Sequence, residues 1–185
     1  MLVLLLAALA TPPDLVPLTE QGVHLAVPDG WKSWIDIDKH NATCALGLST
    51  SLRLYWYDYK ERLGLDRLLD ITLQTTRDNV PIGTLVEIER RPAHDGAARA
   101  LLAEYRLWRY RMNVVIVAFN DALHDRMVVA VTLADPDRFT EIDAPDLTAR
   151  VVASLHTDDD PRREQLALNP PERRLYDEPL GSLLP

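Results

Sequence analysis

The chain has little cysteine, little glycine and a deficit of positive charge. Cys44 is the one cysteine among 185 residues, which excludes an internal disulfide and a cysteine-based zinc cluster. Seven glycines leave little room for a glycine-rich loop that would cradle phosphates. The net charge of −8, from 20 basic and 28 acidic residues, argues against nucleic acid as a partner, because phosphate binding needs a basic face.

Catalytic and metal-binding motifs are missing as well. The sequence holds no G-x-S-x-G turn, no P-loop, no G-x-G-x-x-G, no H-E-x-x-H and no EF-hand loop. The pairs His94-Asp95 and His124-Asp125 fall in predicted turns, where aspartate caps the backbone. We therefore predict no catalytic residue, no metal site, no cofactor and no enzymatic activity. The alternative from a different class is a small hydrolase or metal-dependent enzyme that uses His94 or His124.

The first ten residues are similar to part of a secretory signal peptide. Residues 2–9 form an unbroken apolar run, residues 8–10 have the small-x-small form of a cleavage site, and the positive n-region is missing. The run is too short to span a bilayer, which takes ~20 residues. We predict a truncated signal peptide over residues 1–10 in an exported, periplasmic or secreted protein. The alternative is a buried N-terminal strand or helix turn in a cytoplasmic protein.

The rest of the chain divides into a linker, one domain and a tail. Residues 11–21 are proline-rich and predict an extended linker, and residues 157–185 are rich in proline and charge and predict a C-terminal tail. Between them, residues 22–156 fit a single α+β domain, in which Cys44 lies in an apolar stretch and is expected to be a small buried hydrophobe. Arginine greatly outnumbers lysine, which is typical of a GC-rich bacterial genome.

Hydrophobic periodicity predicts the elements of this domain. An apolar stripe at three- and four-residue spacing predicts a helix from residue 65 to about 79. Residues 99–107, 114–119 and 126–133 predict an antiparallel meander, with Val114–Phe119 as a central strand that is covered on both faces. Asp135-Pro136 predicts a helix start, and a second start near residues 143–146 predicts a closing helix that ends around His156.

One group of aromatic and basic residues predicts a binding surface. Trp, Tyr and Arg are the residue types that carry interface hot spots when they are exposed. Such residues alternate around one predicted strand end, and we select them as candidate partner-binding residues: Arg106, Trp108, Arg109, Tyr110 and Arg111. The alternative is that the aromatic side chains line the core while the arginines lie at its edge.

Three short segments carry a resemblance to a known family. Residues 27–31 (Val-Pro-Asp-Gly-Trp) follow the first strand, Gly96 opens the meander, and residues 151–155 (Val-Val-Ala-Ser-Leu) lie on the closing helix. With the order of elements, these segments resemble the PsbP-like superfamily, which includes the photosystem II extrinsic protein, a Ran-binding nuclear-import factor and bacterial DcrB-type proteins. The resemblance covers about residues 22–155.

The resemblance implies an antiparallel sheet with helices on both faces, an α/β/α sandwich. It also implies a role in docking or assembly, with no catalytic residue carried over. Pro28 and Gly30 would shape the first turn, and Trp31 would plug one end of the core. We therefore expect a protein partner and possible association with the cell envelope, with no nucleic acid and no transmembrane segment. The alternative is a cytoplasmic DcrB-type secretion chaperone that cradles an apolar segment of an effector.

Overall fold

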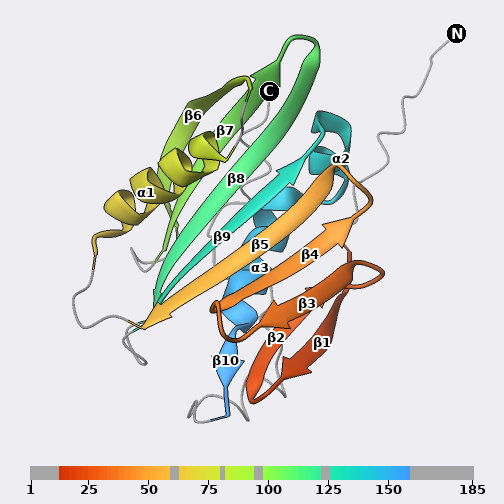
Figure 1. Ribbon diagram of the computed structural model, residues 1–185, viewed down its shortest axis with the longest axis vertical. Coiled ribbons are helices and arrows are strands. Elements are labelled where there is room, and N and C mark those ends of the chain that lie inside the picture. The colour runs from red at the N-terminus through yellow and green to blue at the C-terminus, as the bar shows by residue number, and fades with distance from the viewer. Residues whose placement is uncertain (1–12, 59–62, 80–81, 94–97, 122–125, 159–185) are drawn as a thin grey trace, which may run out of the picture.

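The structure is a computed structural model that describes residues 13–58, 63–79, 82–93, 98–121 and 126–158. These residues form two antiparallel sheets and three helices (Figure 1). In chain order the elements are β1 (Leu15–Glu20), β2 (Val23–Pro28), β3 (Lys32–Asp36), β4 (Asn41–Leu46), β5 (Thr50–Asp58), α1 (Leu65–Asp78), β6 (Thr84–Ala93), β7 (Ala98–Leu107), β8 (Tyr110–Asp121), β9 (Arg126–Ala134), α2 (Pro136–Glu141), α3 (Ala144–Ser154) and β10 (His156–Thr157).

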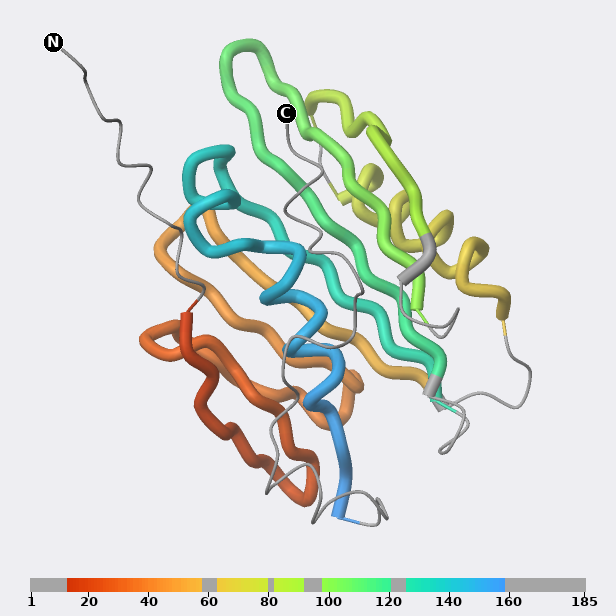
Figure 2. The backbone as a smooth tube through the Cα atoms, turned by 180° about the vertical axis from the view of Figure 1, so that it is seen from behind, coloured from red at the N-terminus to blue at the C-terminus, as the bar shows by residue number. Residues whose placement is uncertain are grey.

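The large sheet has seven strands in the order β3-β4-β5-β9-β8-β7-β6. Every neighbouring pair is antiparallel, and β7, β8 and β9 form the three-strand meander that the sequence predicts. β8 lies inside the sheet, and Val114–Ala118 are fully buried because helices cover both faces. α1 lies on one face and α3 on the other, as the two opposite views show (Figures 1 and 2). The predicted α+β class, with helices on both faces, is confirmed.

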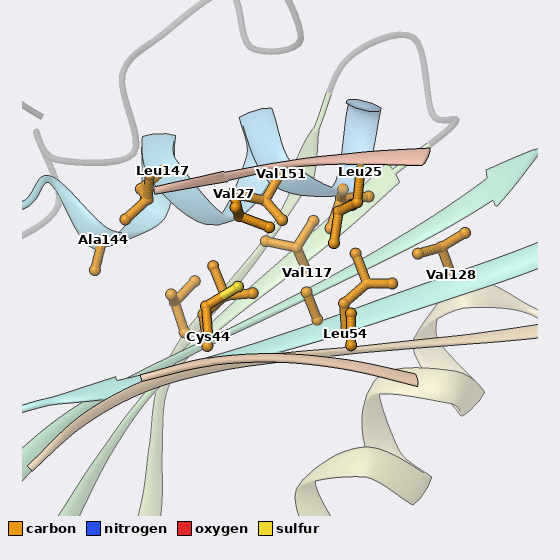
Figure 3. Close-up of a cluster of buried hydrophobic side chains, with 14 of the residues drawn as sticks. Leu25, Val27, Cys44, Leu54, Val117, Val128, Ala144, Leu147 and Val151 are labelled. Carbon is orange, nitrogen blue, oxygen red and sulfur yellow. The ribbon is translucent and has the colours of Figure 1, made fainter. Parts of the chain in front are cut away.

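The core is split in two by the large sheet. On one face, α1 buries Leu68, Leu69 and Leu73 against β7, β8 and β9. On the other face, α3 and β2 pack onto the sheet, and Leu147 and Val151 from α3 meet Leu25 and Val27 from β2 (Figure 3). The sulfur atom of Cys44 points into the same cluster.

The N-terminal part of the domain differs from the predicted linker. Residues 15–20 within the predicted linker, residues 11–21, form β1, which pairs with β2 along its whole length. Leu15 and Leu18 pack against the core. The segment reads as a linker because β1 is an edge strand with most side chains in solvent, and a proline such as Pro17 is tolerated on an edge.

The closing part of the domain also differs by a few residues. α3 ends at Ser154, and residues 156–157 form β10, which pairs with β2 in the small sheet β1-β2-β10. The start of the predicted tail is therefore part of the domain. The predicted signal peptide, residues 1–10, lies outside the described residues, and so does the remainder of the tail, residues 159–185.

Cys44 is fully buried on β4, as predicted. Burial raises the pKa of its thiol above the ordinary value of 9.0, and a hydrogen bond with Ser33 opposes this rise. The unfolded chain therefore loses this proton at lower pH than the folded chain does. We expect the free energy of unfolding to fall as the pH rises above 9.0, by at most ~1.4 kcal/mol per pH unit from this group. Urea unfolding of wild type and Cys44→Ala at pH 7 to 10 checks this, because only the wild type has the cysteine contribution. Equal slopes would contradict it.

Candidate functional site

The tip of the β7–β8 hairpin carries the residues selected from the sequence. Leu107 pairs with Tyr110, so Trp108 and Arg109 form a two-residue connection. The hairpin extends three residue pairs beyond the end of β9, since the pairing of β8 with β9 begins at Asn113. The tip therefore projects from one end of the large sheet (Figure 1).

Trp108 lies in a position that is unfavourable for the stability of the fold. Its side chain is 97% exposed and its backbone φ is +51°, in the left-handed region. Left-handed backbone costs ~1–2 kcal/mol for a residue with a Cβ, and two-residue hairpin turns ordinarily use glycine, asparagine or aspartate there. Neither packing nor turn formation explains a tryptophan at this position, which points to a function outside the fold.

Two of the arginines around Trp108 share one face of the hairpin. Arg106 and Arg111 are directly opposite each other, and such a like-charged pair is destabilising by itself. Glu104, whose side chain is 12% exposed, lies between them. Arg106 Nε donates to Glu104 Oε2 at 2.7 Å, and Arg111 Nη1 lies 3.6 Å from Glu104 Oε1. Glu104 therefore fixes the direction of both guanidinium groups.

Two further side chains complete the tip. Tyr110 is exposed and shares the α1 side of the sheet with Leu107, and Arg109 has no ion-pair partner among the described residues. The three arginines and Glu104 leave two positive charges at the tip of an acidic chain. We call Arg106, Trp108, Arg109, Tyr110 and Arg111 the hairpin surface. Its chemistry fits an acidic partner surface with an apolar pocket.

The sequence does not identify Ile82, which lies beside this surface. Ile82 is exposed, and its carbonyl accepts a hydrogen bond from the hydroxyl of Tyr105 on β7. Next to it, Gly83 has φ +119° and lies against the side chain of Tyr105 and the carbonyl of Arg106. The only sequence signal is an apolar residue between Pro81 and Gly83, which a turn alone does not require.

Residues 28–31, which carry part of the family resemblance, lie at the end of β2 and in the turn between β2 and β3. Trp31 N donates to the carbonyl of Pro28 at 3.2 Å, and Gly30 has φ +75° in the turn between β2 and β3. Trp31 is half-buried and packs against the core cluster of β2 and α3. These residues shape the fold and bring no reactive group together.

A groove of about 440 Å³ lies on the α1 side of the large sheet. It forms because α1 packs over β7 and β8, which leaves the adjoining face of β9 and β5 open beside the helix. Val129 and Val131 form its floor, Tyr55 and Tyr57 line the β5 side, and Ile71 lines the helix side. No motif predicts this groove, because it depends on the lateral position of α1.

A histidine network joins the two ends of the domain. Both ring nitrogens of His24 form hydrogen bonds. Nδ1 lies 3.0 Å from Thr19 Oγ1, and Nε2 lies 2.8 Å from Asp158 Oδ1. The ring of His24 stacks on that of His156 with centroids 4.8 Å apart. The network ties β10 to β2. The sequence gives no sign of it, since His24 and Asp158 are 134 residues apart.

The remaining sequence candidates lie outside the described residues, among them His94-Asp95 and His124-Asp125. Within the described ranges, no group of three or more His, Cys, Asp or Glu side chains is placed to hold a metal ion. No helix in the same ranges is long and apolar enough to cross a membrane.

Comparison with known proteins identifies the fold. No protein-family model and no curated protein matches the sequence. Among solved structures, cyanobacterial PsbP (CyanoP) from Synechocystis sp. PCC 6803 is similar with a TM-score of 0.57 and 12% identity, covering 80% of this chain and 94% of that protein. The Ran-binding protein Mog1p of Saccharomyces cerevisiae has a TM-score of 0.56 and 9% identity, covering 80% and 97%. The chain has the PsbP-like fold that its sequence predicts.

Proposed function

We propose that this domain of PsbP-like fold is an exported, non-catalytic module that docks onto another protein through the hairpin surface. The observation that carries the proposal is Trp108, an almost fully exposed tryptophan in a left-handed turn position. Backbone strain of this kind persists where function requires it. Its neighbours Arg109 and Tyr110 are residue types that dominate interface hot spots.

The partner surface is defined by the chemistry of the tip. An indole that is surrounded by guanidinium groups fits an apolar pocket with carboxylates at its rim. Glu104 supports this by holding Arg106 and Arg111 in fixed directions, which lowers the entropy lost when the two arginines bind carboxylates. Mog1p, a similar structure, is itself described as Ran-binding, which is consistent with a protein-docking role for this fold.

Export is the second part of the proposal. It rests on the apolar run of residues 2–9 and the small-x-small residues 8–10. Expression from the native gene, with its upstream region, followed by cell fractionation checks this. We expect a shortened chain outside the cytoplasm. Uncleaved protein in the cytoplasm would contradict export and leave the docking proposal standing.

Trp108→Asn is expected to abolish docking without loss of stability. Asparagine tolerates the left-handed backbone, so we expect the free energy of unfolding to stay equal or rise by up to ~1 kcal/mol. Loss of a hot-spot tryptophan weakens binding by ~2 kcal/mol or more, at least thirtyfold. A photocrosslinking residue at position 82, beside the hairpin surface, gives the readout in producing cells, as a crosslinked product of defined mass that Trp108→Asn removes.

The matched control is Trp34→Ala. Trp34 is also exposed, at 45%, but lies on β3 at the far edge of the large sheet. We expect this variant to crosslink at position 82 like the protein with the unchanged Trp34. If Trp34→Ala removes the product while Trp108→Asn keeps it, the docking surface is not the hairpin surface.

A further inference from the structure

The groove beside α1 is lined by apolar, aromatic and uncharged polar residues and, among the described residues, by one charged residue. Val129 and Val131 form its floor, with Tyr55 and Tyr57 on the β5 side and Ile71 on the helix side. Arg53, opposite Val131 in the register of β5 and β9, also lines it. Among the described residues, no aspartate or glutamate lines the groove. Its electrostatic preference is therefore for an anion.

Arg53 is free to bind such an anion. It is exposed, and its guanidinium group has no hydrogen-bond or ion-pair partner among the described residues. Two other arginines are, in contrast, held by carboxylates: Arg90 by Glu87 and Asp70, and Arg138 by Glu141. In a chain of net charge −8, an arginine left unpaired beside an apolar groove stands apart from these.

Two threonine hydroxyls on the helix side of the groove do not offer their hydrogens to a ligand. The hydroxyls of Thr72 and Thr76 donate to the carbonyls of Leu68 and Thr72 at 2.8 and 2.7 Å. Their donor hydrogens are therefore engaged within α1. The charged donor of the groove is Arg53, and a guanidinium binds a carboxylate through two parallel hydrogen bonds.

The groove does not suit an extended peptide. β9 and β5 are interior strands whose backbone groups already pair with their neighbours. A peptide strand on this face would leave its own N–H and C=O groups without partners, which is costly in an apolar site. A chain of methylene groups carries no such requirement. The volume of about 440 Å³ lies in the range of ~300–1,000 Å³ that small-molecule sites occupy.

We propose that this groove binds a free single-chain amphiphile with an anionic head, a fatty-acid-like carboxylate. Arg53 binds the carboxylate, and the acyl chain lies along Val129 and Val131 between Tyr55 and Ile71. The site is separate from the hairpin surface and does not depend on the docking function. It makes the domain a carrier or sensor of acyl carboxylates in addition to a docking module.

Calorimetric titration of the full chain with sodium decanoate below its micelle concentration tests the proposal. We expect saturable binding with one ligand per chain. Arg53→Gln should weaken decanoate binding by ~10-fold or more, because a charge-assisted hydrogen bond is lost, and leave the weaker binding of decanol unchanged. Ile71→Glu, which introduces a negative charge on the helix side, should abolish binding of both ligands.

Two variants serve as controls. Arg67→Gln removes an exposed arginine of α1 that does not line the groove, and Trp108→Asn alters the hairpin surface. Both should bind decanoate like the wild type, so this test is independent of docking. Equal affinity of Arg53→Gln and wild type would overturn the assignment. Absence of saturable decanoate binding would do the same, as would binding only to phosphatidylglycerol vesicles or to an apolar peptide.

Discussion

Phe139→Ala is expected to lower the free energy of unfolding by about 3–5 kcal/mol, the range for removing a fully buried phenylalanine. Phe139 has no exposed surface and is the buried residue of α2, a helix of six residues. α2 packs against β8, β9 and α3, so this side chain anchors the connection between the meander and the closing helix. A loss of this size is a large part of the ~5–15 kcal/mol that stabilises an ordinary domain.

Urea unfolding, followed by tryptophan fluorescence and circular dichroism, measures this loss. Leu48→Ala is the control, because Leu48 is fully exposed in the turn between β4 and β5. Its truncation should change the free energy of unfolding by no more than ~0.5 kcal/mol. A loss below about 1 kcal/mol for Phe139→Ala would mean that α2 is not anchored in the core through this residue.

Gly83→Ala is expected to lower the free energy of unfolding by about 2–5 kcal/mol. A Cβ at this position would lie 2.5 Å from Cε2 of Tyr105 and 2.7 Å from the carbonyl oxygen of Arg106. The backbone φ of +119° adds strain for any residue with a Cβ, ~1–2 kcal/mol, to the ~1–3 kcal/mol of overpacking. The main-chain carbonyl cannot move without disturbing the pairing of β6 with β7, so the contact is not relieved by a side-chain rotation.

The matched variant is Gly30→Ala. Gly30 also has positive φ, +75°, but a Cβ there meets nothing within 4 Å. Its free energy of unfolding should fall only by the cost of backbone strain, ~1–2 kcal/mol. The difference between the two variants in thermal or urea unfolding therefore isolates the contact of residue 83 with β7. Equal losses would show that φ alone requires glycine at position 83.

Elements with a strong local pattern could be predicted from the sequence. The apolar run Val114–Phe119 predicts a covered central strand, and β8 is that strand, with residues 114–118 fully buried. The stripe of α1 and the Asp135-Pro136 start of α2 are likewise local, and the side chain of Asp135 accepts a hydrogen bond from Arg138 N. In each case a residue's neighbours in sequence determine its environment.

Other features depend on partners that the sequence does not name. β1 is an edge strand that contains Pro17 and has four of its six residues exposed, so its pattern resembles a linker. β6 has a bulge between Glu87 and Glu89, and the one extra residue of a bulge has no compositional sign. The groove beside α1 depends on where the helix settles across the sheet, which side-chain packing decides.

The hairpin surface lies between these cases. The sequence identifies its residues, because tryptophan and arginine are unusual around a two-residue turn. It does not reveal that Arg106 and Arg111 share a face with Glu104, since this follows from the register of β7 and β8. The sequence therefore predicts which residues form the surface. It does not predict the arrangement that directs the guanidinium groups.

The small sheet also sets the order in which a growing chain can fold. Ala26 N donates to Ser154 Oγ at 2.9 Å, and Asp158 N donates to the carbonyl of Gly22 at 2.9 Å, so β2 is completed by residues made about 130 positions later. During synthesis from the N-terminus, the core cluster around Val23, Leu25 and Val27 stays incomplete until α3 has been made, because α3 contributes Leu147 and Val151 to it. A nascent chain that ends before residue 144 has β1 and β2 but neither Ser154 nor β10, so the second edge of β2 stays unpaired until the end of the domain has been made.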